Sequence, residues 1–195
     1  MTVIARKGRN RIPLIGLLRF FMLALLDYES LPVSVEPGDP AAPEVARAVA
    51  QAIRAAEPRL RVEHIGSTAV PGLAGKGVVD LVVLYREVGL ARTREVLDAL
   101  GFRRQAGRDP FPESRPMRVA CLDWKGRRHR LHAHVVSAAS DEAADMIFFR
   151  ERLRTDRGLR AEYEILKHDL VRRGITDGVD YANAKGAFVR KALLL

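Results

Sequence analysis

The sequence has few of the features that staple or anchor small proteins. Its 195 residues include one tryptophan and one cysteine, Cys121. A single cysteine excludes both an intrachain disulfide and a cysteine metal cluster. Such cysteine usage is typical of proteins in a reducing compartment, so we expect a cytoplasmic location.

Long hydrophobic runs are also lacking. The apolar run over residues 14–26 is interrupted by Arg19 and is shorter than the roughly 20 residues that a membrane span requires. No small-residue cleavage site follows it, which argues against a secretory signal. A basic amphipathic helix of residues 12–26 lying on a membrane is an alternative that we do not favour. We expect residues 1–30 to lie outside the fold and residues 31–195 to form one domain.

Acidic residues are the scarcer charge. There are 24 of them against 33 Lys and Arg, which gives a net charge of +9 and favours anionic partners. Residues 101–130 hold nine basic and three acidic side chains. A nucleic-acid platform interleaves basic residues with stacking aromatics, and only Phe111 and Trp124 occur here. Nucleic acid is therefore not the partner that we expect.

Apolar periodicity predicts the regular elements of the first half of the chain. Residues 43–58 carry apolar side chains at three- and four-residue spacing, which predicts a helix, and residues 59–65 alternate as a short strand does. Residues 78–85 are apolar on both faces except at Asp80. That pattern is typical of a central strand that is buried on two sides.

The rest of the chain predicts one hairpin and several helices. The strand-like segments "MRVACLDW" and "HRLHAHVV" flank the turn "KGRR". Helices are expected over residues 87–100, from Ser140, over residues 159–173 and from about Val179 onward. The proline-rich "LPVSVEPGDPAAP" predicts a short strand and then a turn. This order of elements predicts an α/β fold, with a mixed sheet flanked by helices and a helical C-terminal half.

The stretch "RVEHIGSTAVPGLAGKGVVDLVVLY" carries the clearest chemical signal. Gly66 lets a phosphate approach the backbone, and Ser67 adds a hydroxyl donor beside the free amides of a helix start. Asp80 follows inside an apolar strand, where a carboxylate is costly unless it meets a cation or hydrogen-bond donors. A divalent metal bridging phosphate oxygens is one such partner. The alternative is that Asp80 caps a helix or pairs with Lys76 or an arginine.

The residue identities in this stretch are more specific than the spacing of Gly66, Ser67 and Asp80 alone. "EHIGSTAVPGLAGK" followed by "VVDLVV" resembles the signature of the GrpB family, which belongs to the nucleotidyltransferase-like superfamily. "VEPGDPAAP", "LHAHVV", "FFRERLR", "YEILK" and "YANAKGAFV" resemble further segments of that family in the same order. The resemblance covers about Val33 to Val189.

The resemblance implies a nucleotidyltransferase-type fold and a nucleotide pocket. Enzymes of that superfamily use a Gly-Ser, an Asp-x-Asp pair and a third acid to hold two metal ions around a nucleoside triphosphate. Gly66, Ser67 and Asp80 match this pattern, but Val82 stands where the second acid is expected. His132 and His134 stand on the strand where the third acid is expected. Either these histidines form an altered metal or acid–base site with Asp80, or the two-metal site has decayed to a binding pocket. A third alternative is that they form only a polar face of the sheet, hydrogen-bonded to Asp80 or Glu63.

The C-terminal helices offer further cations. Arg150 with Arg154, Tyr163 with Lys167, and Tyr181 with Lys185 each share a helix face. These faces either bind phosphates at the pocket mouth or pack between helices. The candidate catalytic residues are Asp80, His132 and His134, with Asp80 the expected ligand of Mg²⁺ or Mn²⁺. The candidate ligand-binding residues are Gly66, Ser67, Thr68, Lys76, Arg150, Lys167 and Lys185.

Two functional hypotheses follow. The first is a nucleotidyltransferase-like protein that binds a nucleotide or another phosphorylated small molecule and transfers a nucleotidyl group if it is an enzyme. The alternative is a non-catalytic accessory or partner domain, because GrpB domains resemble the extra domain of some dephospho-CoA kinases, which implies a role in coenzyme A synthesis. The chain has no Gly-x-x-x-x-Gly-Lys-Ser/Thr loop, so it does not carry the kinase itself.

Overall fold

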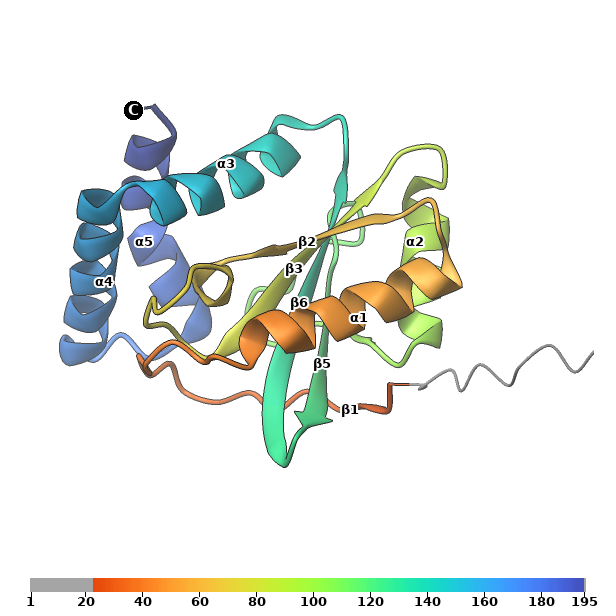
Figure 1. Ribbon diagram of the computed structural model, residues 1–195, viewed down its shortest axis with the longest axis horizontal. Helices are drawn as coiled ribbons and strands as arrows, with labels where there is room; N and C mark the ends of the chain where they lie inside the picture. The colour runs from red at the N-terminus through yellow and green to blue at the C-terminus, as the bar shows by residue number, and fades with distance from the viewer. Residues whose placement is uncertain (1–22, 195) are drawn as a thin grey trace, which may run out of the picture.

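The computed structural model describes residues 23–194, which form a mixed β-sheet flanked by helices (Figure 1). The strands are β1 (Leu25–Leu26), β2 (Arg61–Ile65), β3 (Val78–Tyr85), β4 (Arg103–Arg104), β5 (Met117–Trp124) and β6 (Arg127–Ser137). The helices are α1 (Ala42–Ala56), α2 (Gly89–Ala99), α3 (Asp141–Thr155), α4 (Arg157–Arg172) and α5 (Gly178–Leu194), with a 3₁₀ turn η1 (Ser67–Ala69).

The strand order is β1-β5-β6-β3-β2, and β4 also pairs with β5. β3 and β6 are parallel, whereas the other pairs are antiparallel. The predicted mixed sheet and the hairpin β5–β6 are confirmed. β3 lies between β6 and β2 and is buried on both faces, as its apolar composition predicted.

Local sequence explains where the helices begin and end. The apolar side chains of α1 at three- and four-residue spacing, such as Val45, Val49 and Ile53, form its buried face. The Ser140 side chain caps α3 by accepting a hydrogen bond from the Ala143 amide. Gly174 follows α4 with a φ of 79°, a conformation that few other residues adopt.

The two faces of the sheet are covered differently. α1 and α2 pack on one face, where Leu81, Val83 and Leu131 belong to the main core. On the other face α3 covers only the C-terminal halves of β3 and β6, where Val82 and Leu84 pack against its side chains. α3, α4 and α5 pack against one another beside the sheet (Figure 1). The N-terminal halves of β3 and β6 are not covered by α3 on this second face, which leaves room there for a site.

The domain begins earlier than the sequence predicted. Residues 23–30 were expected outside the fold, but β1 pairs with β5, and the Tyr28 hydroxyl bonds His132. The strand expected in "LPVSVEPGDPAAP" is only an isolated bridge between Glu36 and Gly75. Most of the proposed membrane-contacting segment, up to residue 22, lies outside the described residues. Within residues 23–194, no helix combines the length and apolarity that crossing a membrane requires.

Candidate functional site

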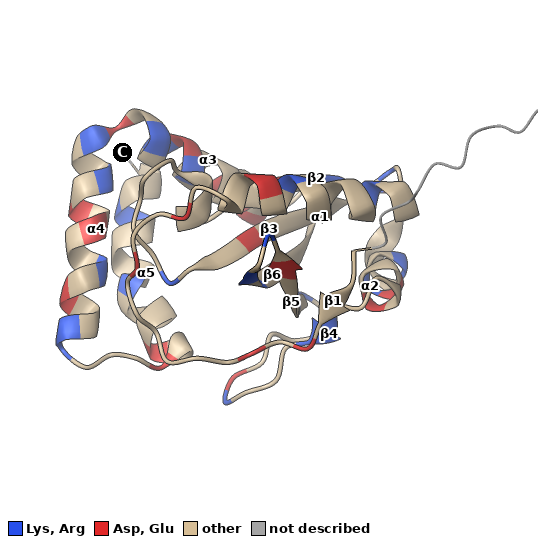
Figure 2. Cartoon of the chain, turned by 60° about the horizontal axis from the view of Figure 1, so that its bottom comes forward, with Lys and Arg blue, Asp and Glu red and all other residues tan. Residues whose placement is uncertain are grey.

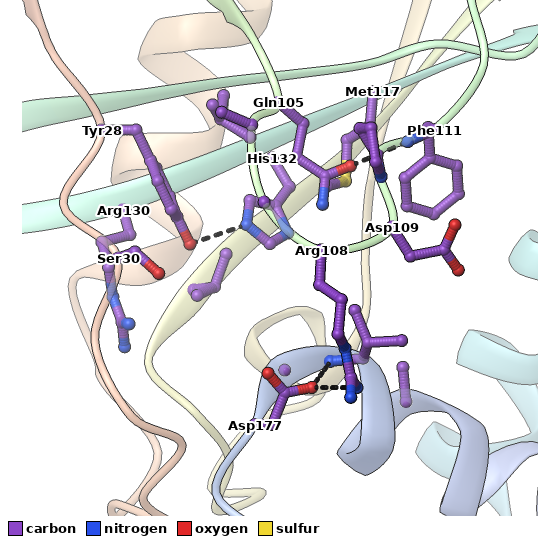
Figure 3. Close-up of a pocket in the computed structure, with 18 of the residues that line it drawn as sticks. Tyr28, Ser30, Gln105, Arg108, Asp109, Phe111, Met117, Arg130, His132 and Asp177 are labelled. Atoms are coloured by element: carbon purple, nitrogen blue, oxygen red, sulfur yellow. Dashed lines mark hydrogen bonds and ion pairs between the residues drawn. The ribbon is translucent and has the colours of Figure 1, made fainter.

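A cavity of about 420 Å³ lies against β3, β5 and β6 on the open part of the sheet (Figure 3). Three other segments enclose it: residues 28–33, the loop 105–112 and residues 177–183 at the start of α5. Of the residues singled out from the sequence, Lys76, Asp80, His132 and His134 line this cavity. The remaining ones lie behind it or away from it.

Parallel pairing of β3 with β6 brings the acid and the two histidines together. Asp80 pairs in register with His132, and both histidines point to the same face because they are two residues apart on a strand. Asp80 Oδ1 lies 3.1 Å from His132 Nδ1 and 3.9 Å from His134 Nε2. The expected common face is confirmed, and Asp80 meets imidazoles and not an arginine.

Protonation in this cluster is set by burial and by neighbouring charge. Burial pushes the pKa of Asp80 upward, but Lys76 and the two histidines outweigh it and hold that pKa well below its usual range. Burial, and then Lys76, lower the pKa of His132 to about 4 against the opposing pull of Asp80. At neutral pH the carboxylate is therefore ionised, and the imidazole of His132 is neutral.

The turn after β2 is shaped to receive Asp80. Gly66 has a φ of 72° and a ψ of −171°, a region that glycine alone readily occupies. A Cβ atom at Gly66 would lie 2.6 Å from Asp80 Oδ2. The Thr68 hydroxyl donates to the Val78 carbonyl and also contacts the His64 ring, 3.0 Å away in each case. The Thr68 hydroxyl is thus engaged within the protein, and the His64 ring supports the Gly-Ser turn through it.

His64 makes stability dependent on pH. Burial lowers its pKa from 6.5 to about 4, so the unfolded chain takes up this proton first as the pH falls. The contribution of the neutral His64 ring to the free energy of unfolding is therefore fully present above pH 6.5. It declines as the pH falls toward 4, by up to roughly 3 kcal/mol. In denaturant unfolding, the free energy of unfolding of His64→Gln should fall less steeply between pH 6.5 and 4 than that of the parent. His168→Gln, which changes an exposed histidine on α4, should keep the parent slope. Equal slopes for all three proteins would contradict this account.

Of the two lysines singled out on the C-terminal helices, Lys167 lies against the Gly-Ser loop. The Lys167 side chain is 1% exposed, and its ammonium donates to the Ala74 carbonyl and lies 3.4 Å from Ser67 Oγ. Lys185 Nζ lies 4.2 Å from the Tyr181 ring centroid, and burial lowers the pKa of Lys185 to about 7. Neither lysine lines the cavity. Lys167 thus contacts the loop, whereas Lys185 contacts the rings of Tyr163 and Tyr181.

Arg150 and Arg154 do not reach the cavity either. Arg150 is buried and bonds Glu63 Oε2 at 3.0 Å and the His64 carbonyl at 2.8 Å. Arg154 donates to the Ala69 carbonyl. The Arg150 guanidinium instead joins α3 to the edge strand β2, so the phosphate-binding role suggested by the sequence stays a prediction.

Several cavity residues were missed by sequence reasoning. Tyr28 lay in the segment expected outside the fold, and Arg108 and Phe111 lay in residues 101–130, which were considered only as a nucleic-acid surface. Arg130 could have been found, because it is two residues before His132 on the same strand face. The neighbouring His129 is 3% exposed and lies outside the cavity, with Nδ1 3.3 Å from Asp39 Oδ2.

The amino-acid sequence matches one protein family over most of its length. The family model described as GrpB protein matches residues 32–194. The chain belongs to the GrpB family. A UPF0157 protein of Pseudomonas aeruginosa is 35% identical to this GrpB chain over 163 residues, which make up 83% of the chain and 66% of that protein. The alignments span 62% to 66% of the first three curated UPF0157 relatives, so the chain covers slightly less than two thirds of their length.

Solved structures show the same fold. The crystal structure of GrpB from Enterococcus faecalis is 24% identical, covers 83% of this chain and 95% of that chain, and has a TM-score of 0.63. A Cid1 poly(U) polymerase structure with Mg 3'-dATP bound is 19% identical, covers 77% of this chain and 49% of that chain, and has a TM-score of 0.51. The GrpB chain therefore has a nucleotidyltransferase-like α/β fold.

One group of relatives is longer and carries a named activity. A dephospho-CoA kinase of Mycobacterium tuberculosis is 29% identical over 178 residues, which correspond to 79% of this GrpB chain and 43% of that protein. The matched part is thus less than half of the kinase chain. This agrees with the resemblance to the additional domain of such kinases.

Proposed function

We propose that this GrpB-family protein binds a nucleotide or another phosphorylated small molecule in the cavity. The proposal rests chiefly on the environment of the Lys76 ammonium. Lys76 lines the cavity and is half-buried, and within residues 23–194 its ammonium has no ion pair or hydrogen bond. A half-buried ammonium without a partner is costly, and a phosphate group supplies the oxygens that satisfy it.

The remaining lining fits such a ligand. Arg130 and Arg108 add positive charge, and the rings of Tyr28 and Phe111 offer apolar surfaces for a base (Figure 3). A volume of about 420 Å³ is within the range of small-molecule sites. Basic and acidic residues are interleaved along α4 (Figure 2), so this helix does not offer the continuous basic face that nucleic acid binds.

The residues do not fit the pair of Mg²⁺ ions that the fold implies. Mg²⁺ requires oxygen ligands, and Val82, fully buried, occupies the second acid's position. The other acids lining the cavity are Asp109 on the loop and Asp177, which pairs with Arg108. We therefore propose ligand binding, and nucleotidyl transfer through two Mg²⁺ ions is not part of it.

The proposal predicts which cation controls affinity. Isothermal titration of the full chain with nucleoside triphosphates, phosphorylated coenzyme A precursors and inorganic phosphate should find at least one ligand. Lys76→Met should weaken its binding about 10- to 100-fold, because a charge-assisted contact is lost. Lys125→Met is the matched control, since this exposed lysine pairs with Glu44 away from the cavity and should not change affinity. Absence of binding by every compound, or an unchanged affinity in Lys76→Met, would overturn the proposal.

A second function, supported by the dephospho-CoA kinase match, is that of a non-catalytic partner in coenzyme A synthesis. Ile165 on α4 is 68% exposed and offers an apolar contact for a kinase domain. Addition of this protein should then stimulate or stabilise a separate dephospho-CoA kinase. Ile165→Glu should abolish the effect, whereas Lys76→Met should retain it. The reverse pattern would favour the ligand-binding function. A cytoplasmic location belongs to both proposals.

A further inference from the structure

His134 lies beside Asp80 with a buried ring nitrogen that has no partner among the described residues. Within the described part of the chain, its ring makes no hydrogen bond, and its Nδ1 atom is buried without a partner. Its Nε2 atom faces Asp80 Oδ1 at 3.9 Å, which is too long for a hydrogen bond. The nearby His132 Nδ1 completes a group whose three ligand atoms lie within 4.8 Å of one another.

The geometry points to a site for one transition-metal dication of the Zn²⁺ class, held by Asp80 Oδ1, His132 Nδ1 and His134 Nε2. Two ligands about 2.1 Å from one tetrahedral ion are separated by about 3.4 Å. The observed separations of 3.1 Å and 3.9 Å lie on either side of that value. This inference goes beyond the ligand-binding proposal and does not depend on it.

The donor set selects the class of metal. Two imidazole nitrogens and one carboxylate suit Zn²⁺, Co²⁺ or Fe²⁺, whereas Mg²⁺ prefers oxygen ligands. Three protein ligands leave one coordination position open. That position faces a cavity lined by Lys76 and Arg130, so a water molecule or an anionic oxygen is the expected fourth ligand.

Tyr28 is a positioning residue for this metal site. Its hydroxyl oxygen lies 2.9 Å from His132 Nε2, the ring nitrogen opposite the metal-facing Nδ1. Without metal, Nδ1–H donates to Asp80 and Nε2 accepts from Tyr28. With metal on Nδ1, the ring proton moves to Nε2, which then donates to the tyrosine oxygen. Metal binding therefore reverses the direction of this hydrogen bond.

The test uses the full chain after removal of metal with a chelator. Calorimetric titration with Zn²⁺ or Co²⁺ should show one site, and Mg²⁺ should bind at least 100-fold more weakly. The bound Co²⁺ should show the intense visible absorption of a low-coordinate ion. Histidine ¹⁵N spectra of the Zn²⁺ form should place the His132 proton on Nε2.

Variants separate this site from adventitious binding. His134→Ala should lose at least 100-fold in Zn²⁺ affinity and the low-coordinate Co²⁺ spectrum, while Tyr28→Phe should lose about 10-fold. His168→Ala removes an exposed histidine on α4 and should bind as the parent does. The proposal is overturned by a six-coordinate Co²⁺ spectrum in the parent, by equal Mg²⁺ binding, or by unchanged affinity in a folded His134→Ala. The parent spectra decide the question if that variant does not fold.

Discussion

Gly66→Ala is expected to lower the free energy of unfolding by about 3–5 kcal/mol. The backbone there lies in a region that costs a residue with a Cβ atom about 1–3 kcal/mol. The added Cβ would also lie 2.6 Å from Asp80 Oδ2, a carboxylate that His132 holds in place. Either the loop or the carboxylate must move, so the cluster is disturbed as well. Denaturant unfolding measures the loss.

Gly72→Ala is the matched control for this prediction. Gly72 has a nearly equal φ of 75°, but an added Cβ would meet no atom within 4 Å. Gly72→Ala should therefore show the cost of a positive φ without the clash. In the double variant Gly66→Ala/Asp80→Ala, the clash with the carboxylate is removed, so the two losses should not add. A Gly66→Ala protein no less stable than Gly72→Ala would contradict the close approach of Asp80.

The second large effect is expected at Arg150. Arg150→Met should lower the free energy of unfolding by about 2–4 kcal/mol, because it leaves Glu63 and the His64 carbonyl without a buried donor. The same change should leave ligand affinity at the cavity unaltered, since Arg150 does not line it. Chemical denaturation and calorimetric titration of one preparation measure both quantities.

Arg61 provides an internal comparison for Arg150. Both arginines bind the carboxylate of Glu63, at 2.9 Å for Arg61 and 3.0 Å for Arg150. The Arg61 side chain is 64% exposed, whereas that of Arg150 is 10% exposed. An exposed ion pair contributes about 1 kcal/mol or less, so Arg61→Met should be nearly neutral. Equal losses for the two variants would mean that burial does not govern this pair. A loss of ligand affinity in Arg150→Met alone would restore the phosphate-binding role.

The proposed metal site and the proposed ligand site share the cavity on one face of the sheet. Lys76 affects both, because its charge acts on Asp80 and His132 while its ammonium faces the cavity. A ligand anion that pairs with Lys76 would weaken this influence on the cluster. Ligand binding and protonation of the cluster are therefore expected to be coupled.

The amino-acid sequence by itself determined the type and order of the main elements. Apolar periodicity is a local property, and it placed α1, β3, the β5–β6 hairpin and the C-terminal helices close to their observed positions. It also placed His132 and His134 on one face, because alternation along a strand needs no tertiary information. The motif wording identified the family, and with it the fold.

Only the tertiary structure decided which side chains meet. Parallel pairing of β3 with β6 sets Asp80 opposite His132, and strand pairing is not encoded within either strand alone. Tyr28 reaches the site because β1 joins the sheet beside β5, far away in sequence. Arg150 and Lys167 turn toward a strand and a loop because helix packing fixes which face is inward. A local pattern gives the element and its faces, but the partner of each face depends on contacts between distant segments.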